Sequence, residues 1–310
     1  MEADLTSLGR ALGQLCFPGI SGATLANLVD GCPAGTLVEI VYESDDPELL
    51  SLAFETACLP DGRVLALQPP VITMRRLLGV KPPDFAPFAG PLKILVAVAA
   101  PDEGLSGGAV LDQERELQNI LDAVEPAQRH ENCQVRILEV GHPVVIGGAL
   151  KSDAYHVLHL SCHGLPGALE MENEEGAACR TTAAELLDPV REAGRPLPLV
   201  LLNSCQGGVP AGEAASLAEA LLRGGAPAVL AMQAPVSDFY AIRLADAFYR
   251  HLSTREHLLP SRALADAREE LERARLAALQ RGAPTAETQP EYATASLFVA
   301  GPERPIADFA

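Results

Sequence analysis

Two reactive side chains each stand at the end of an apolar run and are followed by glycine. His163 follows the run 155–162 and precedes Gly164, and Cys205 ends the run 198–205 and precedes a Gln-Gly-Gly sequence. A thiol is a strong nucleophile only as a thiolate, and an imidazole within reach removes or stabilises its proton at neutral pH. These residue types predict nucleophilic catalysis, with Cys205 as the nucleophile and His163 as the general base.

This chemistry requires two strands that bring the residues together. Sites in open α/β sheets form in the crevice beyond the carboxyl ends of the strands, so His163 and Cys205 face each other there if their strands are adjacent. Glycine lets the backbone approach a substrate carbonyl, and we expect the backbone amides of Gly164 and Cys205 to form an oxyanion hole. The sequence also fits the caspase signature, a Cys-Gln-Gly with a histidine about 50 residues upstream; here the separation is 42 residues (205 − 163).

The rest of the sequence supplies such a sheet. From residue 93 onward, short apolar runs alternate with helical patterns, which is typical of a parallel sheet with crossover helices. The pattern predicts an α/β fold with a mostly parallel central sheet flanked by helices. The predicted strands are residues 93–100, 133–140, 155–162, 198–205, 227–232 and 293–301, and a long helix with an apolar stripe is predicted over residues 239–252.

Residues 1–90 are richer in turns and lead into the Pro-rich stretch 81–91, which is the best candidate linker. Within them we expect strands at 36–43 and 63–68 and a helix opened by Pro47. The pattern divides the chain into an N-terminal α+β extension, residues 1–90, and a core, residues 91–310.

Two other side chains of the run 155–162 have structural interpretations. His159 lies inside an apolar stretch, where we interpret it as a core histidine with satisfied hydrogen bonds. Cys162 points to the face opposite His163, because side chains alternate along a strand, and it is interpreted as core. The same alternation places His159, Cys162 and His163 on two faces, so we expect no tetrahedral metal site formed with Cys205.

The composition limits the classes of partner. A formal net charge of −18 disfavours direct binding to nucleic acid or to an anionic membrane surface. The acidity attracts a basic protein or peptide partner, or serves solubility alone. The seven cysteines form no CxxC pair, and the N-terminus has no signal-peptide pattern. We therefore expect a cytoplasmic protein without a membrane span.

Several motifs resemble the CHAT family of caspase-like cysteine peptidases, in the clan of caspases and separases. The resemblance rests on "YHVLHLSCHG", "LVLLNSCQGG", "GEAASLAEALLRGGAPAVLAM", "PVSD" and "DAFYRHL", in the family's order and spacing, and extends over about residues 13–301. It implies a caspase-like three-layer sandwich, a His163 and Cys205 dyad, and cleavage of a protein or peptide substrate without a metal or organic cofactor. It also implies a bacterial protease that a sensor protein or domain switches on, in antiviral defence or programmed cell death.

In caspase-type folds, the segment after the fifth strand lines the pocket for the substrate residue that precedes the cleaved bond. That segment here is "QAPVSD", which contains Gln233, Ser237 and Asp238. A carboxylate in this pocket favours Lys or Arg, with a small or apolar residue as the alternative. Acidic residues of the segment after the histidine would add negative potential: Glu170, Glu172, Glu174 and Glu175. Two structural interpretations stay open, because Asp238 also suits a helix cap and the acidic segment a solvated loop. Gln233 stands where the family often has Trp, so the family's specificity is not carried over.

Two other functions remain open. A degenerate peptidase fold would act as an interaction module, although the intact histidine and cysteine pair argues against it. A nucleotide-binding domain requires a GxGxxG or GxxxxGK loop after the first strand, where this chain has "AAPDEGLSGG". The chain is either a free-standing protease activated by a partner or a piece of a longer protein, and we expect low activity from the isolated chain.

Overall fold

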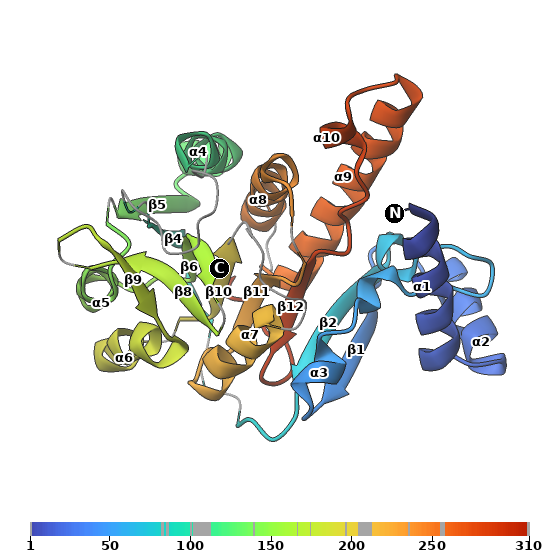
Figure 1. The fold of residues 1–310 in the computed structure, drawn as a ribbon, viewed down its shortest axis with the longest axis horizontal. Helices are drawn as coiled ribbons and strands as arrows, with labels where there is room; N and C mark the ends of the chain where they lie inside the picture. Colours follow the sequence, from blue (N-terminus) through green and yellow to red (C-terminus); the bar gives the residue numbers. More distant parts are fainter. Residues whose placement is uncertain are drawn as a thin grey trace.

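A central eight-stranded sheet organises the chain (Figure 1). The computed structural model describes residues 2–81, 84, 87–99, 101, 113–138, 140–165, 167–173, 175–195, 197–203, 213–234, 236–254 and 258–308. In spatial order, the strands of the sheet are β1 (Val38–Ser44), β2 (Val71–Leu77), β12 (Ala295–Val299), β11 (Ala228–Met232), β10 (Leu199–Asn203), β6 (Val157–Ser161), β4 (Leu92–Val98) and β5 (Cys133–Leu138). All six strands predicted from residue 93 onward are present.

The pairing within this sheet is mostly parallel, as predicted. From β5 through β4, β6 and β10 to β11, each strand is parallel to the next, whereas β12 is antiparallel to β11. Strand β12 then pairs with β2, and β2 with β1, both in parallel. Strands covered on both faces have continuous apolar sequences, which explains why β10 and β11 are recognisable from sequence alone.

Helices cover both faces of the sheet, which confirms the predicted three-layer sandwich (Figure 1). None of the helices in the described part of the chain is long and apolar enough to cross a membrane. The helices are α1 (Glu2–Cys16), α2 (Ile20–Asp30), α3 (Pro47–Leu50), α4 (Gln113–Arg129), α5 (Pro143–Ser152), α6 (Ala183–Ala193), α7 (Glu213–Arg223), α8 (Asp238–Ser253), α9 (Pro260–Gln280) and α10 (Thr285–Thr288), with short 3₁₀ helices at Phe54–Thr56 and Leu65–Leu67.

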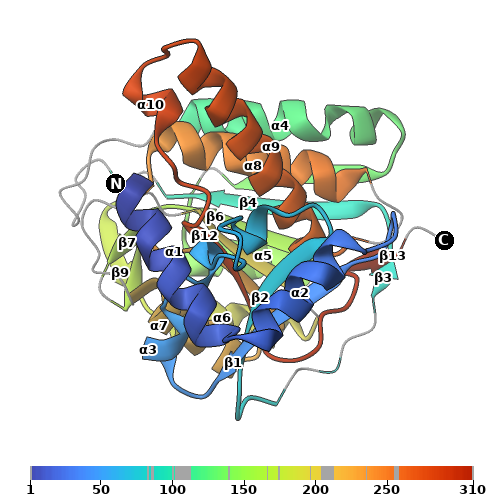
Figure 2. The ribbon, with the colours of Figure 1, turned by 90° about the vertical axis from the view of Figure 1, so that its right-hand side faces the viewer.

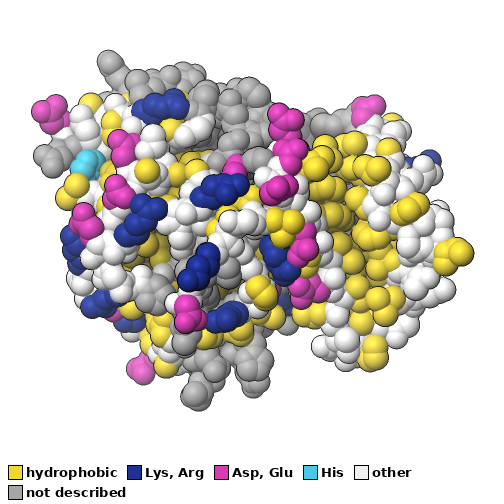
Figure 3. Space-filling model, turned by 90° about the horizontal axis from the view of Figure 1, so that it is seen from below, with side chains coloured by type: hydrophobic (Ala, Val, Ile, Leu, Met, Phe, Trp, Pro, Cys, Tyr) yellow, Lys and Arg dark blue, Asp and Glu magenta, His cyan; other side chains and the backbone are white. Residues whose placement is uncertain are grey.

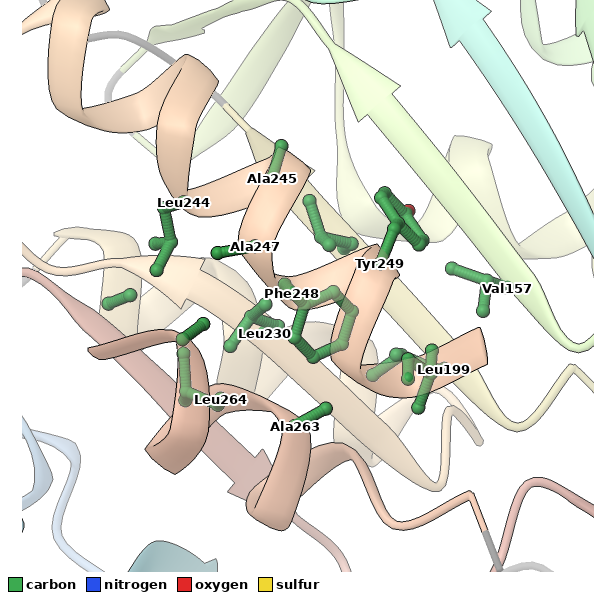
Figure 4. Close-up of a cluster of buried hydrophobic side chains, with 14 of the residues drawn as sticks. Val157, Leu199, Leu230, Leu244, Ala245, Ala247, Phe248, Tyr249, Ala263 and Leu264 are labelled. Atoms are coloured by element: carbon green, nitrogen blue, oxygen red, sulfur yellow. The ribbon is translucent and has the colours of Figure 1, made fainter. Parts of the chain in front are cut away.

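The core divides into two layers according to strand alternation. In β4, Ile94 and Val96 pack against α4, α8 and α9, whereas Leu95 and Ala97 pack against α5, α6 and α7. Figure 4 shows Phe248 pointing from α8 toward the strands of the sheet, on the face that α4, α8 and α9 cover. Both faces of the central strands are covered by these two layers, so a site open to solvent is expected in the loops beyond the strand ends.

The N-terminal helices stand at one side of the molecule, against β1 and β2 (Figures 1 and 2). They have small cores of their own, in which Leu25 and Val29 contact Val38 and Val71. Their outer surface carries exposed apolar side chains, and Figure 3 shows apolar side chains gathered over this side of the molecule. The large exposed apolar residues of α1 and α2 are Leu8, Leu15, Ile20 and Leu28.

One local prediction for residues 1–90 was wrong, and one strand there was not predicted. Residues 63–68 do not form a strand of the sheet, because Leu65–Leu67 is a 3₁₀ helix and Val64 makes only an isolated bridge with Cys58. The strand that pairs with β1 is β2, residues 71–77, whose sequence VITMRRL carries two arginines and was not recognised. The predicted helix at Pro47 is confirmed as α3, with Asp46 as its N-cap.

Candidate active site

Strands β6 and β10 are direct neighbours, as the predicted pairing of His163 with Cys205 requires. They pair in parallel, and the last residues in register are Ser161 and Asn203. His163 follows Ser161 by two residues, and Cys205 follows Asn203 by two residues. Cys205 and the glycines after it lie outside the described residues. The two strands therefore end side by side, and His163 lies at the edge of the sheet where they end.

His163 begins strand β7 (His163–Leu165) of a small three-stranded sheet with β8 (Ala168–Glu172) and β9 (Ala178–Thr181). Strands β3 (Phe88–Ala89) and β13 (Ala307–Asp308) form a separate two-stranded sheet. The His163 side chain is half-buried, and Gly164 is opposite Leu169 of β8. Cys162 is buried, as predicted, and burial raises the pKa of its thiol to about 12. It therefore stays a protonated thiol at neutral pH, unlike a catalytic cysteine.

Two residues of the acidic segment after His163 are buried, contrary to the interpretation of the whole segment as a solvated loop, whereas Glu175 is exposed in the turn that follows β8. Glu170 and Glu172 lie on β8 and are 1% and 6% exposed. Glu170 is the register partner of His163 on one side and of Arg180 on the other. Directly opposite residues of antiparallel strands project from the same face with Cβ atoms about 5 Å apart. Glu170 therefore lies beside the imidazole of His163, while Glu174 is outside the described residues.

A buried polar cluster lies behind the strand ends, and sequence reasoning found only part of it. His159 is fully buried, as predicted: its Nε2 is 3.0 Å from Oε1 of Glu116 on α4, and its Nδ1 is 2.8 Å from the hydroxyl of Tyr249 on α8. The hydroxyl of Ser161 donates to Oε2 of Glu116 at 2.5 Å, and the amide of Asn203 donates to Oε1. Glu116 itself is 6% exposed.

The charge of Glu116 is stabilised by these donors. Burial by itself raises the pKa of the carboxyl group, but the hydrogen bonds from His159, Ser161 and Asn203 more than offset it, and the pKa is lowered overall. No signal in the sequence marks Glu116, because it directly precedes the apolar stripe of α4 and looks like a surface residue of a helix. Its partners are 43 to 87 residues away in the chain.

The predicted substrate-binding residues lie around the end of β11 and the start of α8. Gln233 follows β11, is 9% exposed, and donates from Nε2 to the carbonyl of Leu50 at 3.2 Å. Ser237, rather than Asp238, is the N-cap of α8, since its Oγ accepts from the amide of Tyr240 at 3.2 Å. Asp238 occupies the first turn and is exposed. Its carboxylate is therefore open to solvent.

A cavity of about 560 Å³ lies away from these residues. It is lined by the end of α2, the turn before β1 and the start of α9. Among its lining residues Arg262 alone is charged, and its Nη1 donates to the carbonyl of Pro69 at 2.8 Å. The cavity includes no residue of the sheet that carries His163. No group of three or more His, Cys, Asp or Glu side chains that would suit a metal ion occurs within the described ranges.

Comparison with known proteins assigns this chain to a family. The CHAT domain model matches residues 6–291, so the chain belongs to the CHAT domain family. The crystal structure of the Arg-specific cysteine proteinase gingipain R is similar, with a TM-score of 0.51 and 11% identity over 94% of this chain and 68% of that chain. This likeness shows the fold, which is that of caspase-like cysteine proteases.

Two further solved structures are similar to this chain. The separase of the Saccharomyces cerevisiae separase–securin complex is 12% identical, with a TM-score of 0.45 over 85% of this chain and 16% of that chain. A secreted C11 cysteine protease from Bacteroides thetaiotaomicron is 10% identical, with a TM-score of 0.39 over 59% of this chain and 58% of that chain. This chain thus spans about a sixth of the separase and less than two thirds of the C11 protease. No curated protein matches it.

Proposed function

We propose that this member of the CHAT domain family is a cysteine endopeptidase in which Cys205 is the nucleophile and His163 the general base. The observation that carries the proposal is the adjacency of β6 and β10, whose last paired residues, Ser161 and Asn203, each precede one member of the dyad by two residues. Parallel strands that end side by side bring the residues that follow them to one edge. His163, half-buried at this edge, is accessible to a substrate.

The reaction follows from the chemistry of the two side chains. His163 accepts the thiol proton of Cys205, and the thiolate attacks the carbonyl carbon of the scissile bond. The backbone amides of Gly164 and Cys205 stabilise the oxyanion of the tetrahedral intermediate. His163 then donates the proton to the leaving amine, and the resulting thioester is hydrolysed by a water molecule that His163 deprotonates. Neither a metal nor an organic cofactor takes part.

For the substrate, we propose Lys or Arg before the cleaved bond. Asp238 is exposed at the start of α8, and Gln233 lies at the end of β11, in the segment assigned to the pocket. The formal net charge of −18 favours the approach of a basic segment. A small or apolar residue is the alternative, since Gln233 is largely buried and already bonded to Leu50.

We also propose that the protease acts on a specific protein in the cytoplasm, and that a sensor protein or domain activates it, in bacterial antiviral defence or programmed cell death. The exposed apolar side chains of α1 and α2 are consistent with a protein partner, because apolar patches rimmed by polar residues mark interaction sites. Ile20 and Leu15 are 86% and 71% exposed. Replacement of both by Glu should remove activation while leaving the unfolding transition unchanged.

The dyad is tested by incubating the protein with the proteins encoded beside it and sequencing the N-termini of the products. We expect cleavage by the unmodified chain, and none by Cys205→Ala or His163→Ala, with unchanged circular dichroism in both variants. Cys162→Ala is the matched control, since it removes a neighbouring buried thiol. Cleavage by the Cys205→Ala variant would refute the assignment. Absence of cleavage by every form, with binding to one of the neighbours retained, would favour the interaction module.

A further inference from the structure

One carboxylate from a helix joins two strands of the central sheet at the edge where they end. Oε2 of Glu116 accepts the hydroxyl of Ser161 at 2.5 Å, and Oε1 accepts the amide of Asn203. Ser161 is the last paired residue of β6, and Asn203 is the last paired residue of β10. The two strands are thus held to each other by a side chain of α4, in addition to their backbone pairing.

We infer that Glu116 is a positioning residue, which sets the relative placement of His163 and Cys205. This inference rests on the proposed function. The two residues of the proposed dyad each follow a residue bound to Glu116 by two positions, so that roughly 7 Å is the greatest span of chain that separates each from it. A general base acts only within hydrogen-bond reach of the proton that it removes. A fixed spacing of the strand ends therefore controls the proton transfer between Cys205 and His163.

A second layer of contacts orients the carboxylate. Nε2 of His159 is 3.0 Å from Glu116, and Nδ1 is 2.8 Å from the Tyr249 hydroxyl. A neutral imidazole with its proton on Nε2 satisfies both contacts, since it donates to the carboxylate and accepts from Tyr249; this tautomer is assigned from the network. Tyr249 comes from α8, and Figure 4 shows it on that helix in the layer that faces the sheet. Helix α4 therefore contacts the ends of both β6 and β10, and α8 joins the same cluster through His159 of β6.

Stability alone does not account for this arrangement. The desolvation of a buried carboxylate offsets much of what its hydrogen bonds contribute, and apolar side chains of similar volume often stabilise a core as well. Both carboxylate oxygens of Glu116 and both ring nitrogens of His159 have partners, while Oδ1 of Asn203 has none among the described residues. A buried network bonded in this way restricts the core to one geometry. Its contribution is therefore expected in the placement of the strand ends, and the test must separate placement from stability.

The chain contains a matched control for this purpose. Ser296 on β12 is also fully buried, and its hydroxyl also donates to a buried carboxylate, Oε1 of Glu55, at 2.8 Å. Ser161→Ala and Ser296→Ala therefore remove the same kind of hydrogen bond, one behind the proposed dyad and one away from it. Glu116→Gln, which keeps the volume, and Tyr249→Phe, which deletes one hydroxyl, provide further variants if Ser161→Ala does not fold.

The readout is the rate at which iodoacetamide alkylates Cys205, followed by mass spectrometry from pH 5.5 to 9, with urea midpoints measured in parallel. An unperturbed thiol with a pKa of about 8.5 is only about 1% ionised at pH 6.5, whereas a thiolate paired with an imidazole is largely ionised. We expect the unmodified chain to react rapidly at pH 6.5. Ser161→Ala and Glu116→Gln should react about tenfold more slowly there, and Ser296→Ala within about twofold of the unmodified chain.

His163→Ala separates the two ways in which the experiment can fail. If His163→Ala is slow at pH 6.5 but Ser161→Ala and Glu116→Gln react like the unmodified chain, the dyad stands and the positioning role is wrong. If His163→Ala also reacts like the unmodified chain, the dyad itself is wrong, and this inference is overturned with it. Equal slowing by Ser296→Ala would show a general loss of stability and would likewise overturn the inference.

Discussion

A buried ion pair between Arg75 and Glu55 lies where the first 90 residues meet β12, since Ser296 of β12 donates to Glu55 and the ring of Phe298 lies near Arg75. Arg75 is fully buried on β2, and Glu55 is 1% exposed. The guanidinium also donates to the carbonyl of Leu50 and lies 5.5 Å from the ring centroids of Phe54 and Phe298. We predict that Glu55→Gln, which leaves this guanidinium without its counter-charge, strongly destabilises the protein.

The magnitude follows from the burial of both partners. Breaking a buried pair by removing one charge costs about 3 to 5 kcal/mol, a large share of the roughly 5 to 15 kcal/mol that stabilises a typical protein. For 310 residues, an unfolding entropy of about 2.1 cal/mol/K per residue sums to about 0.65 kcal/mol/K. A loss of about 4 kcal/mol should therefore lower the melting temperature by about 6 °C.

The neighbouring residue of the same strand offers the control. Arg76 pairs with Glu43, and their side chains are 22% and 43% exposed. Glu43→Gln should cost about 0 to 1 kcal/mol, since partly exposed pairs contribute little. The double variant Glu55→Gln/Arg75→Met removes both charges and should recover most of the loss. Urea unfolding followed by circular dichroism measures all three variants. If Glu55→Gln costs no more than Glu43→Gln, the reasoning from burial is refuted.

Three further predictions concern the site and the response to pH. Cys162→Ala should keep full peptidase activity, because burial raises the pKa of this thiol to about 12; a loss of activity without a loss of stability would implicate it in catalysis. Burial lowers the pKa of His156 to about 4, so from pH 4 to 6.5 the unfolded chain binds a proton that the folded chain does not, and stability should rise with pH in this window by at most about 1.4 kcal/mol per pH unit. His156→Gln should flatten that rise, and an unchanged slope in urea unfolding would contradict it. In peptide-library profiling, Asp238→Asn should weaken a preference for Lys or Arg, whereas Glu170→Gln should lower kcat and leave the preference intact; the reverse pattern would exchange the roles of the two carboxylates.

The strands with continuous apolar sequences were predicted correctly because both faces of these strands are buried. Strands β10 and β11 consist almost wholly of Leu, Val and Ala, and the stripe of α8 follows the helical period. The candidate site depends on the adjacency of β6 and β10. The sequence could not establish this adjacency, and the structure shows it. The positions of His163 and Gly164 at a strand end were predicted for the same reason. The division of the chain at residue 90 stays a prediction. Strand β2 from the first part pairs with β12 from the second, so both parts contribute to one sheet.

Strand β2 and the buried carboxylates could not be predicted from the sequence, and the physical reason is the same for both. A charged residue reads as exposed unless its partner is known, and the partners lie far away in the chain: 20 residues for Arg75 and Glu55, and 43 for Glu116 and His159. Long-range pairing of this kind leaves no periodic signal in the sequence. The same applies to Glu170 on β8, which three other acidic residues nearby made look like part of a solvated loop.

The two carboxylates near the strand ends are expected to act at different steps. Glu116 is saturated by three donors behind the sheet, so its charge is held in place and its effect on the dyad is geometric. Glu170 lies in register with His163, and a negative charge there would stabilise the positive charge that the proposed mechanism places on the imidazole after proton transfer. Loss of Glu116 should therefore disturb the ground-state pairing of thiol and imidazole. Loss of Glu170 should instead raise the energy of the charged intermediate, while the spacing of the strand ends stays unchanged.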